Sequence, residues 1–232
     1  MFGWFRRAPA ASTEEQLRVT QALIGYPLYA PPKWEPDPNP EVMRAASFQY
    51  RDYFLGGTRA RLEALRAFLA NFEVALNLDD AGLMAVSTWL PRWADLLVND
   101  FDDPAVWNAY HRFEAPWLGT LSGLNVVFDL GIYYAECVWI RRTKLEWIVV
   151  RGPEGATHFI KGLPGDGKLF DPIHFMYWEC QYIRKAKVPK PKWHRHFFVE
   201  RPHYEPHILK SDSFSRHVLS KAPPGRRRRK IR

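Results

Sequence analysis

The stretch LSGLNVVFDLGIYYAECVWIRRTK, residues 121–144, decides the fold of this chain. At about 100° per residue it predicts a helix that is apolar around most of its circumference, and such a helix is normally central to its domain. The polar residues gather in a sector of about 80° and are Ser122, Asn125, Asp129, Tyr133, Glu136 and Thr143. We therefore expect a central helix over about 120–143 with one polar stripe that faces either water or a cleft.

The polar stripe carries the strongest candidates for a chemical site. Asp129 and Glu136 are seven residues apart, which is about 10.5 Å along a helix and overlaps the carboxyl separation of inverting glycosidases. Asn125, Asp129, Tyr133 and Glu136 are therefore the candidates for a ligand cleft, and a hydrolase is one alternative function. The simpler interpretation is a solvated face, or carboxylates that satisfy neighbouring loops. No catalytic residue is assigned, because the sequence does not place a basic or nucleophilic partner.

Upstream of this helix, residues 12–98 predict a helical bundle. Ser12 to Glu15 form a capping box for a short helix that runs to about Ile24. Residues 26–40 contain six prolines and predict an extended strap over the surface, anchored by Tyr26, Tyr29 and Trp34. We expect a helix from Pro40 to Leu55 that Gly56-Gly57 ends, and a second helix capped by Thr58. A further helix runs from Asp79 or Asp80 to about Val98, with a kink or break at Pro91.

Downstream of residue 99 the pattern mixes short helices with strands. Asp103-Pro104 predicts the start of one short helix. Residues 145–151 and 156–161 have strand composition around a Gly-Pro-Glu-Gly turn, and residues 168–170 are a candidate third strand. Asp171-Pro172 predicts the start of a last helix. The fold class is therefore α+β: a helix-rich N-terminal bundle around the central helix, a small antiparallel sheet over about 145–170, and a basic C-terminal arm.

Charge divides the 232-residue chain into two unequal parts. Residues 1–184 contain 18 Lys and Arg against 22 Asp and Glu, a net charge of −4, whereas residues 185–232 contain 15 against 3, a net charge of +12. We expect residues 1–184 to form one globular domain, helical over 12–98 and helix-plus-sheet over 104–184. Residues 185–232 form a Pro- and aromatic-containing arm with an Arg-rich tail.

The arm combines cations with aromatic side chains, which is typical of segments that contact nucleic acid. The candidate contacts, to nucleic acid or to a protein partner, are Trp193, Arg195, Phe197, Arg226, Arg227, Arg228, Arg229 and Lys230. The alternative is a solubilising tail or one that docks on the acidic body.

The other motifs in the sequence do not favour a binding site for a metal ion or a cofactor. His194, His196, His203 and His207 form an HxH…HxxxH pattern, but prolines interrupt it and no nearby cysteine completes a zinc site. The GLPGDG turn at 162–167 lacks the Lys-Ser/Thr of a phosphate loop. Cys137 and Cys180 lie in apolar runs and indicate buried free thiols, as in a reducing cytoplasm. No run of about 20 apolar residues lacks charges, so we expect no membrane-spanning helix.

The stretch NVVFDLGIYYAECVWIRRTKLEWIVV resembles a domain of uncharacterised bacterial proteins. The resembling features are a helix with Asp129, Tyr133 and Glu136, two arginines, and a strand with a central tryptophan. The similarity covers residues 120–185, and some of these proteins have the size and style of toxin-immunity proteins. It implies no activity and no functional residue.

The sequence as a whole predicts a non-enzymatic binding protein of the bacterial cytoplasm, of adaptor or immunity type, with a protein partner. A nucleic-acid-binding protein that uses the basic arm is the second hypothesis, and the hydrolase is the third. The sequence does not predict the oligomeric state.

Overall fold

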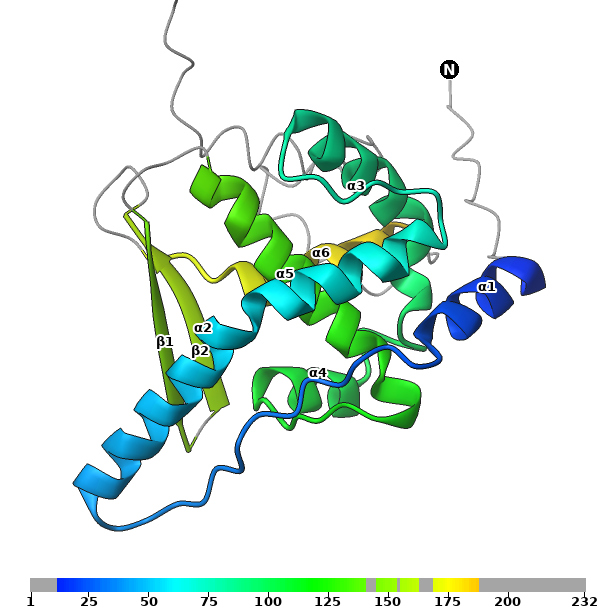
Figure 1. Cartoon of the computed structure of the whole chain (residues 1–232). Coiled ribbons are helices and arrows are strands. Elements are labelled where there is room, and N and C mark those ends of the chain that lie inside the picture. Colours follow the sequence, from blue (N-terminus) through cyan, green and yellow to red (C-terminus); the bar gives the residue numbers. More distant parts are fainter. Residues whose placement is uncertain (1–11, 141–144, 154, 163–168, 188–232) are drawn as a thin grey trace, which may run out of the picture.

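The computed structural model describes residues 12–140, 145–153, 155–162 and 169–187. Within these ranges the protein is α+β, with six α-helices and a two-stranded antiparallel sheet. Helix α5 (Gly123–Ile140) lies at the centre of the molecule (Figure 1). All but three of its residues are buried, so the predicted central helix is confirmed, and a 3₁₀ turn, Gly119–Leu121, precedes it.

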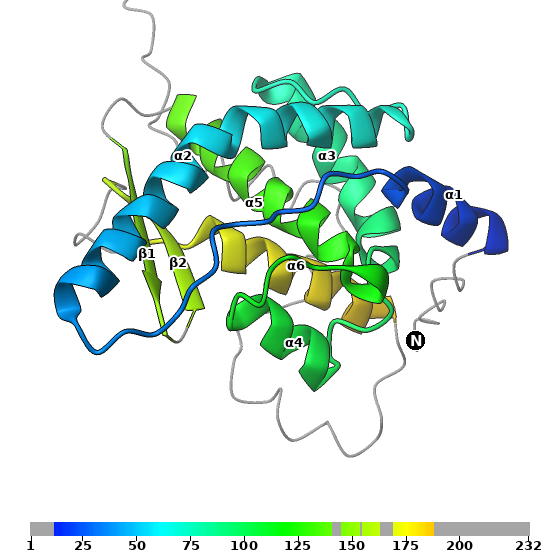
Figure 2. The same ribbon diagram turned by 60° about the horizontal axis from the view of Figure 1, so that its bottom comes forward.

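Four helices and the sheet surround α5. Helix α2 (Pro40–Ala70) crosses it on one side and α6 (Pro172–Lys187) packs along it on another (Figures 1 and 2). Helix α3 (Asp80–Trp93) continues into a 3₁₀ turn, Ala94–Leu96, while α4 (Pro104–His111) lies near the N-terminal half of α5. The predicted short helix after Asp103 is confirmed, and Asp103 caps it by accepting from the Ala105 amide at 2.8 Å.

Strands β1 (Glu146–Gly152) and β2 (Gly155–Lys161) form a hairpin that packs against α2. Trp147 pairs with Ile160 and Val149 with His158, and these four side chains, together with Ala156, form the buried face of the hairpin. The candidate third strand is reduced, among the described residues, to one bridge between Ile160 and Phe170. Asp171 caps α6 as predicted, accepting from the amides of Ile173 and His174.

Helix α1 (Thr13–Leu23) begins with the predicted capping box between Ser12 and Glu15. The predicted helix end at Gly56-Gly57 is wrong, because α2 continues through both glycines to Ala70. Thr58 does not cap a new helix, since its hydroxyl donates to the Leu55 carbonyl inside α2. The second half of α2 buries Leu65, Phe68 and Leu69 in the common core, and this burial outweighs the cost of two glycines. Pro91 does not split α3, which ends two residues later.

Candidate functional site

The connection between α1 and α2, residues 24–39, is extended and crosses one side of α5 (Figure 2). We refer to it as the strap. Its prolines disfavour regular structure, as predicted, so its backbone groups need partners from elsewhere. The polar stripe of α5 supplies them.

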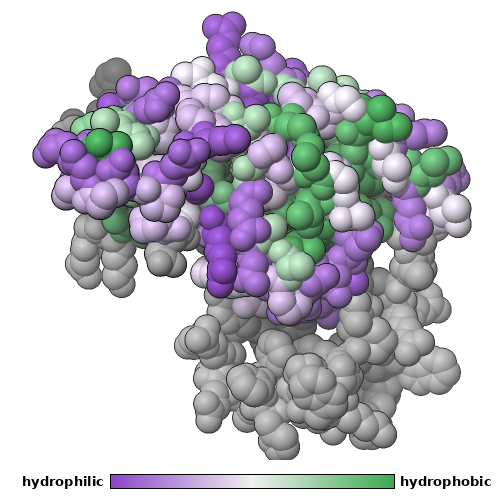
Figure 3. Space-filling view, turned by 90° about the horizontal axis from the view of Figure 1, so that it is seen from below, coloured by the Kyte–Doolittle hydropathy of each residue, from purple (hydrophilic) through white to green (hydrophobic). Residues whose placement is uncertain are grey.

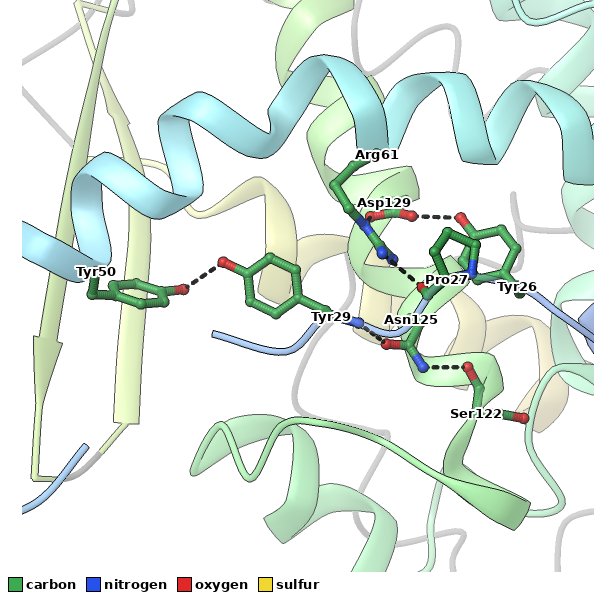
Figure 4. Close-up of polar contacts among 8 residues, drawn as sticks. All are labelled: Tyr26, Pro27, Tyr29, Tyr50, Arg61, Ser122, Asn125 and Asp129. Carbon is green, nitrogen blue, oxygen red and sulfur yellow. Dashed lines mark hydrogen bonds and ion pairs between the residues drawn. The ribbon is translucent and has the colours of Figure 1, made fainter. Parts of the chain in front are cut away.

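Asp129 is the centre of these contacts (Figure 4). Its carboxylate accepts from Arg61 Nε of α2 at 2.8 Å and from the Tyr26 hydroxyl of the strap. Arg61 in turn donates from Nη1 to the Pro27 carbonyl at 2.6 Å. The Asp129 side chain is fully buried and that of Arg61 is 9 % exposed, so this ion pair lies in the protein interior. It links three segments: α5, α2 and the strap.

Burial and charge act in opposite directions on this pair. Burial raises the pKa of Asp129 to about 6, although the Arg61 guanidinium and the Tyr26 hydroxyl lower it. Burial lowers the pKa of Arg61, but the Asp129 carboxylate, with smaller contributions from Tyr26 and Tyr29, raises it, and the net shift is upward. At neutral pH both groups are therefore charged, and each compensates for the lost hydration of the other.

One turn earlier on α5, Asn125 holds the strap by a second set of bonds. Its Oδ1 accepts from the Tyr29 amide at 2.8 Å, and its Nδ2 donates to the carbonyls of Trp117 and Ser122 at 2.9 and 2.8 Å. The Tyr29 side chain enters the core, and its hydroxyl lies 3.2 Å from that of Tyr50 (Figure 4). The predicted anchoring of the strap by Tyr26 and Tyr29 is confirmed.

The other two stripe residues contact different parts of the chain. The Tyr133 hydroxyl donates to the Asn77 carbonyl at 2.8 Å, in the loop between α2 and α3. Glu136 is half-buried; burial raises its pKa, and a hydrogen bond with the Trp147 side chain offsets part of this rise. Asp129 and Glu136 therefore have separate hydrogen-bond partners, which are Arg61 and Tyr26 for Asp129 and Trp147 for Glu136.

Asn125, Asp129 and Tyr133 are all buried and bound to the chain itself. The expectation that the stripe faces water or a ligand cleft is thus not met at these three residues. Their side chains form hydrogen bonds with neighbouring loops instead. We call Asp129, Arg61 and Asn125 the clamp, because together they fix the strap. The remaining candidates, Trp193, Arg195, Phe197, Arg226, Arg227, Arg228, Arg229 and Lys230, lie outside the described residues, as does Thr143.

Sequence reasoning missed Arg61, although a signal was present. Arg61 precedes Leu65 by four residues and Phe68 by seven, so helical spacing places it on the core face of α2. A lone cation on such a face indicates a buried anionic partner, and Asp129 on the central helix was the obvious candidate.

The first part of the strap, residues 24–30, exposes apolar side chains. Leu28 is 42 % exposed, and Leu118, in the loop before α5, is 57 % exposed. The residues next to them, Tyr29 and Trp117, are both hydrogen-bonded to the Asn125 side chain, so Asn125 holds the backbone beside each leucine. We refer to the exposed apolar residues of the strap and of the loop before α5, which are Ile24, Pro27, Leu28, Pro116 and Leu118, as the strap face. Figure 3 shows apolar residues gathered in a band on this side of the molecule.

A second polar cluster lies behind the strap, around His158 of β2. Its Nε2 lies 2.5 Å from the Tyr50 hydroxyl, while Asp171, His174 and Arg151 influence its charge. Burial lowers the pKa of His158 to about 3. His111, stacked on His174 with ring centroids 4.6 Å apart, has its pKa lowered to about 4, mainly by burial.

The contribution of these two histidines to stability depends on pH. Between pH 6.5 and 4 they stay neutral in the folded state but protonate in the unfolded state, so stability falls as the pH is lowered. Asp129 acts in the opposite direction, because its folded pKa is raised. Glu179, whose pKa burial raises to about 7, acts in the same direction as Asp129, and together these carboxyl groups offset most of the histidine contribution at pH 5. The contribution of one histidine is therefore measured by comparing a variant with the unmodified chain in urea unfolding at pH 7 and pH 5. Between these two pH values His158→Gln should gain about 2 kcal/mol of stability relative to the unmodified chain; an unchanged difference would contradict the assignment.

Comparisons with models of protein families, with curated proteins and with solved structures found no match to this chain. In the described ranges, no helix combines the length and apolar character needed to cross a bilayer. The same residues contain no group of three or more His, Cys, Asp and Glu side chains arranged to bind a metal ion.

Proposed function

We propose that this chain is a non-enzymatic interaction protein of the bacterial cytoplasm, of adaptor or immunity type, which binds a protein partner through the strap face. The observation that carries the proposal is the set of exposed apolar side chains Ile24 and Leu28, on the strap, and Leu118, in the loop before α5, two segments that are both hydrogen-bonded to Asn125 of the clamp. Clustered exposed apolar residues are typical of protein-binding surfaces.

The clamp favours binding because it reduces the conformational entropy that the strap would lose on contact with a partner. An extended segment that orders only on contact loses conformational entropy at that moment, whereas a segment already held by buried bonds does not. The Pro27 carbonyl and the Tyr29 amide are both bound to the interior, so Leu28 between them is presented on a fixed backbone. Cys137 and Cys180 are buried thiols, which suit a reducing cytoplasm.

The cationic residues 185–232 suggest that the partner is acidic. The end of α6 is attached to the body by two ion pairs, Arg184 with Asp100 at 3.2 Å and Lys185 with Asp102 at 3.0 Å. A segment of net charge +12 begins at this point. Such a charge accelerates association with an acidic partner and makes the rate dependent on salt.

The test is affinity capture from extracts of the native host with the full chain as bait. We expect Leu28→Asp combined with Leu118→Asp to reduce the recovery of specific protein partners at least tenfold, since two desolvated apolar contacts become charges. The matched control is Val42→Asp combined with Val150→Asp, at two other exposed apolar positions. Equal recovery by the two double variants would contradict a role for the strap face.

Nucleic-acid binding through residues 185–232 is the second candidate function. The four consecutive arginines, 226–229, favour this function because they can neutralise phosphates. Trp193 and Phe197 favour it because aromatic side chains stack on unpaired bases. It predicts micromolar or tighter binding to RNA or DNA that weakens steeply with salt and is lost when residues 188–232 are removed. Nuclease treatment of the capture experiment separates the two candidates, because only protein partners bound directly survive it.

A further inference from the structure

A groove on the opposite end of the molecule from the sheet is not used by the strap or its clamp. It has a volume of about 420 Å³ and lies between α3 and the loop that follows α2. Its lining includes three buried aromatic residues, Phe72, Trp89 and Trp93, together with Met84, which is 43 % exposed. We call it the α3 groove. Large aromatic side chains beside a methionine form a surface suited to another aromatic group.

Helix α1 is fixed beside this groove by its first turns. Glu15 accepts from Arg92 Nε, on the groove lining, at 2.8 Å. Arg18 donates from Nε to the Asn71 carbonyl at 3.0 Å, and its guanidinium lies over the rings of Phe72 and Trp93. The start of α1, and hence the attachment point of the preceding residues, is therefore at the groove.

Residues 1–11, which lie outside the described residues, have the composition that this groove favours. The sequence MFGWFRR places Phe2, Trp4 and Phe5 close together and follows them with Arg6 and Arg7. Six residues lie between Phe5 and Ser12, and the seven steps from one to the other span at most roughly 25 Å. A tether this short gives a millimolar effective concentration at the groove. Exposed Glu73 and Glu14, on the groove loop and the first turn of α1, complement the two arginines.

We propose that the α3 groove binds the aromatic N-terminal segment of the same chain, with Trp4 and Phe5 against Trp89 and Met84. The segment covers the apolar groove and leaves the strap face as the surface for partners. This proposal does not depend on the function of the strap face.

The test is disulfide trapping in the full chain under a glutathione redox buffer. Gly3→Cys is paired with Thr88→Cys in the groove, and the control pairs Gly3→Cys with Thr20→Cys on the exposed side of α1. The native Cys137 and Cys180 are buried. We expect the groove pair to have an effective concentration at least tenfold above the control pair. Replacing Trp4 and Phe5 by serine should remove that difference.

Equal effective concentrations for the two pairs would overturn the proposal. So would a groove pair that is unaffected by the two serine substitutions, since the tether alone would then account for the trapping. The two cysteine positions on the described part of the chain, Thr88 and Thr20, are both exposed, so neither substitution alters the folded core.

Discussion

Replacing Asp129 by alanine is expected to lower the free energy of unfolding by roughly 3–5 kcal/mol, the usual cost of leaving one member of a buried ion pair without its partner. Arg61 would keep its charge in the interior, with Nε unpaired and only the Pro27 carbonyl as an acceptor. The Tyr26 hydroxyl would also lose its acceptor. The measurement is urea unfolding of the full chain at pH 7.

Two variants serve as controls. Glu136→Gln, on the same helix, should cost less than about 1 kcal/mol, because Glu136 is half-buried and is not ion-paired in the part of the chain described. The combination of Asp129→Leu with Arg61→Met should recover most of the loss, because it removes both charges together. If Asp129→Ala were no more costly than Glu136→Gln, the ion pair would not be a stabilising link.

Replacing Gly123 by alanine is expected to cost at least about 3 kcal/mol, because it inserts an atom where a backbone already lies. A Cβ at this position would be 1.8 Å from the carbonyl oxygen of Leu97. The atoms that this Cβ would meet belong to the backbone of Leu97, so no side-chain rotation can relieve the clash. The two segments would have to separate, and α5 would lose its place beside the 3₁₀ turn after α3.

Gly57→Ala is the matched control for Gly123→Ala, since it also changes a glycine within a helix. A Cβ at Gly57 would meet no atom within 4 Å. Alanine there should stabilise α2 by about 0.5–1 kcal/mol, the usual difference between the two residues in a helix. The two substitutions should therefore have opposite signs in thermal or urea unfolding, and equal effects would contradict the close approach at Leu97.

The elements that depend on local sequence were predictable. The period of α5, the caps at Ser12, Asp103 and Asp171, and the hairpin turn all follow from neighbouring residues. The end of a helix at Gly56-Gly57 was predicted wrongly, because glycine indicates only a local preference against helical structure. The helix continues there because residues 61–69 pack against a core that is distant in sequence.

The partners of the polar stripe were not predictable in detail. Asp129 binds Tyr26 across 103 residues and Arg61 across 68, and Asn125 binds Tyr29 across 96. Helical period places these polar groups on one side of α5 but does not say what covers that side. The structure places the strap there, so a stripe with the composition of a binding cleft is used to hold a surface segment.

The central claim is that the clamp fixes the strap, and hydrogen exchange of the Tyr29 amide tests it most directly. This N–H donates to the buried Asn125 side chain and belongs to no helix or strand, so only the clamp protects it. We predict slow exchange in the unmodified chain, and exchange accelerated at least a hundredfold in Asn125→Leu while the amides of α5 stay protected. Rapid exchange of the Tyr29 amide in the unmodified chain would contradict the account.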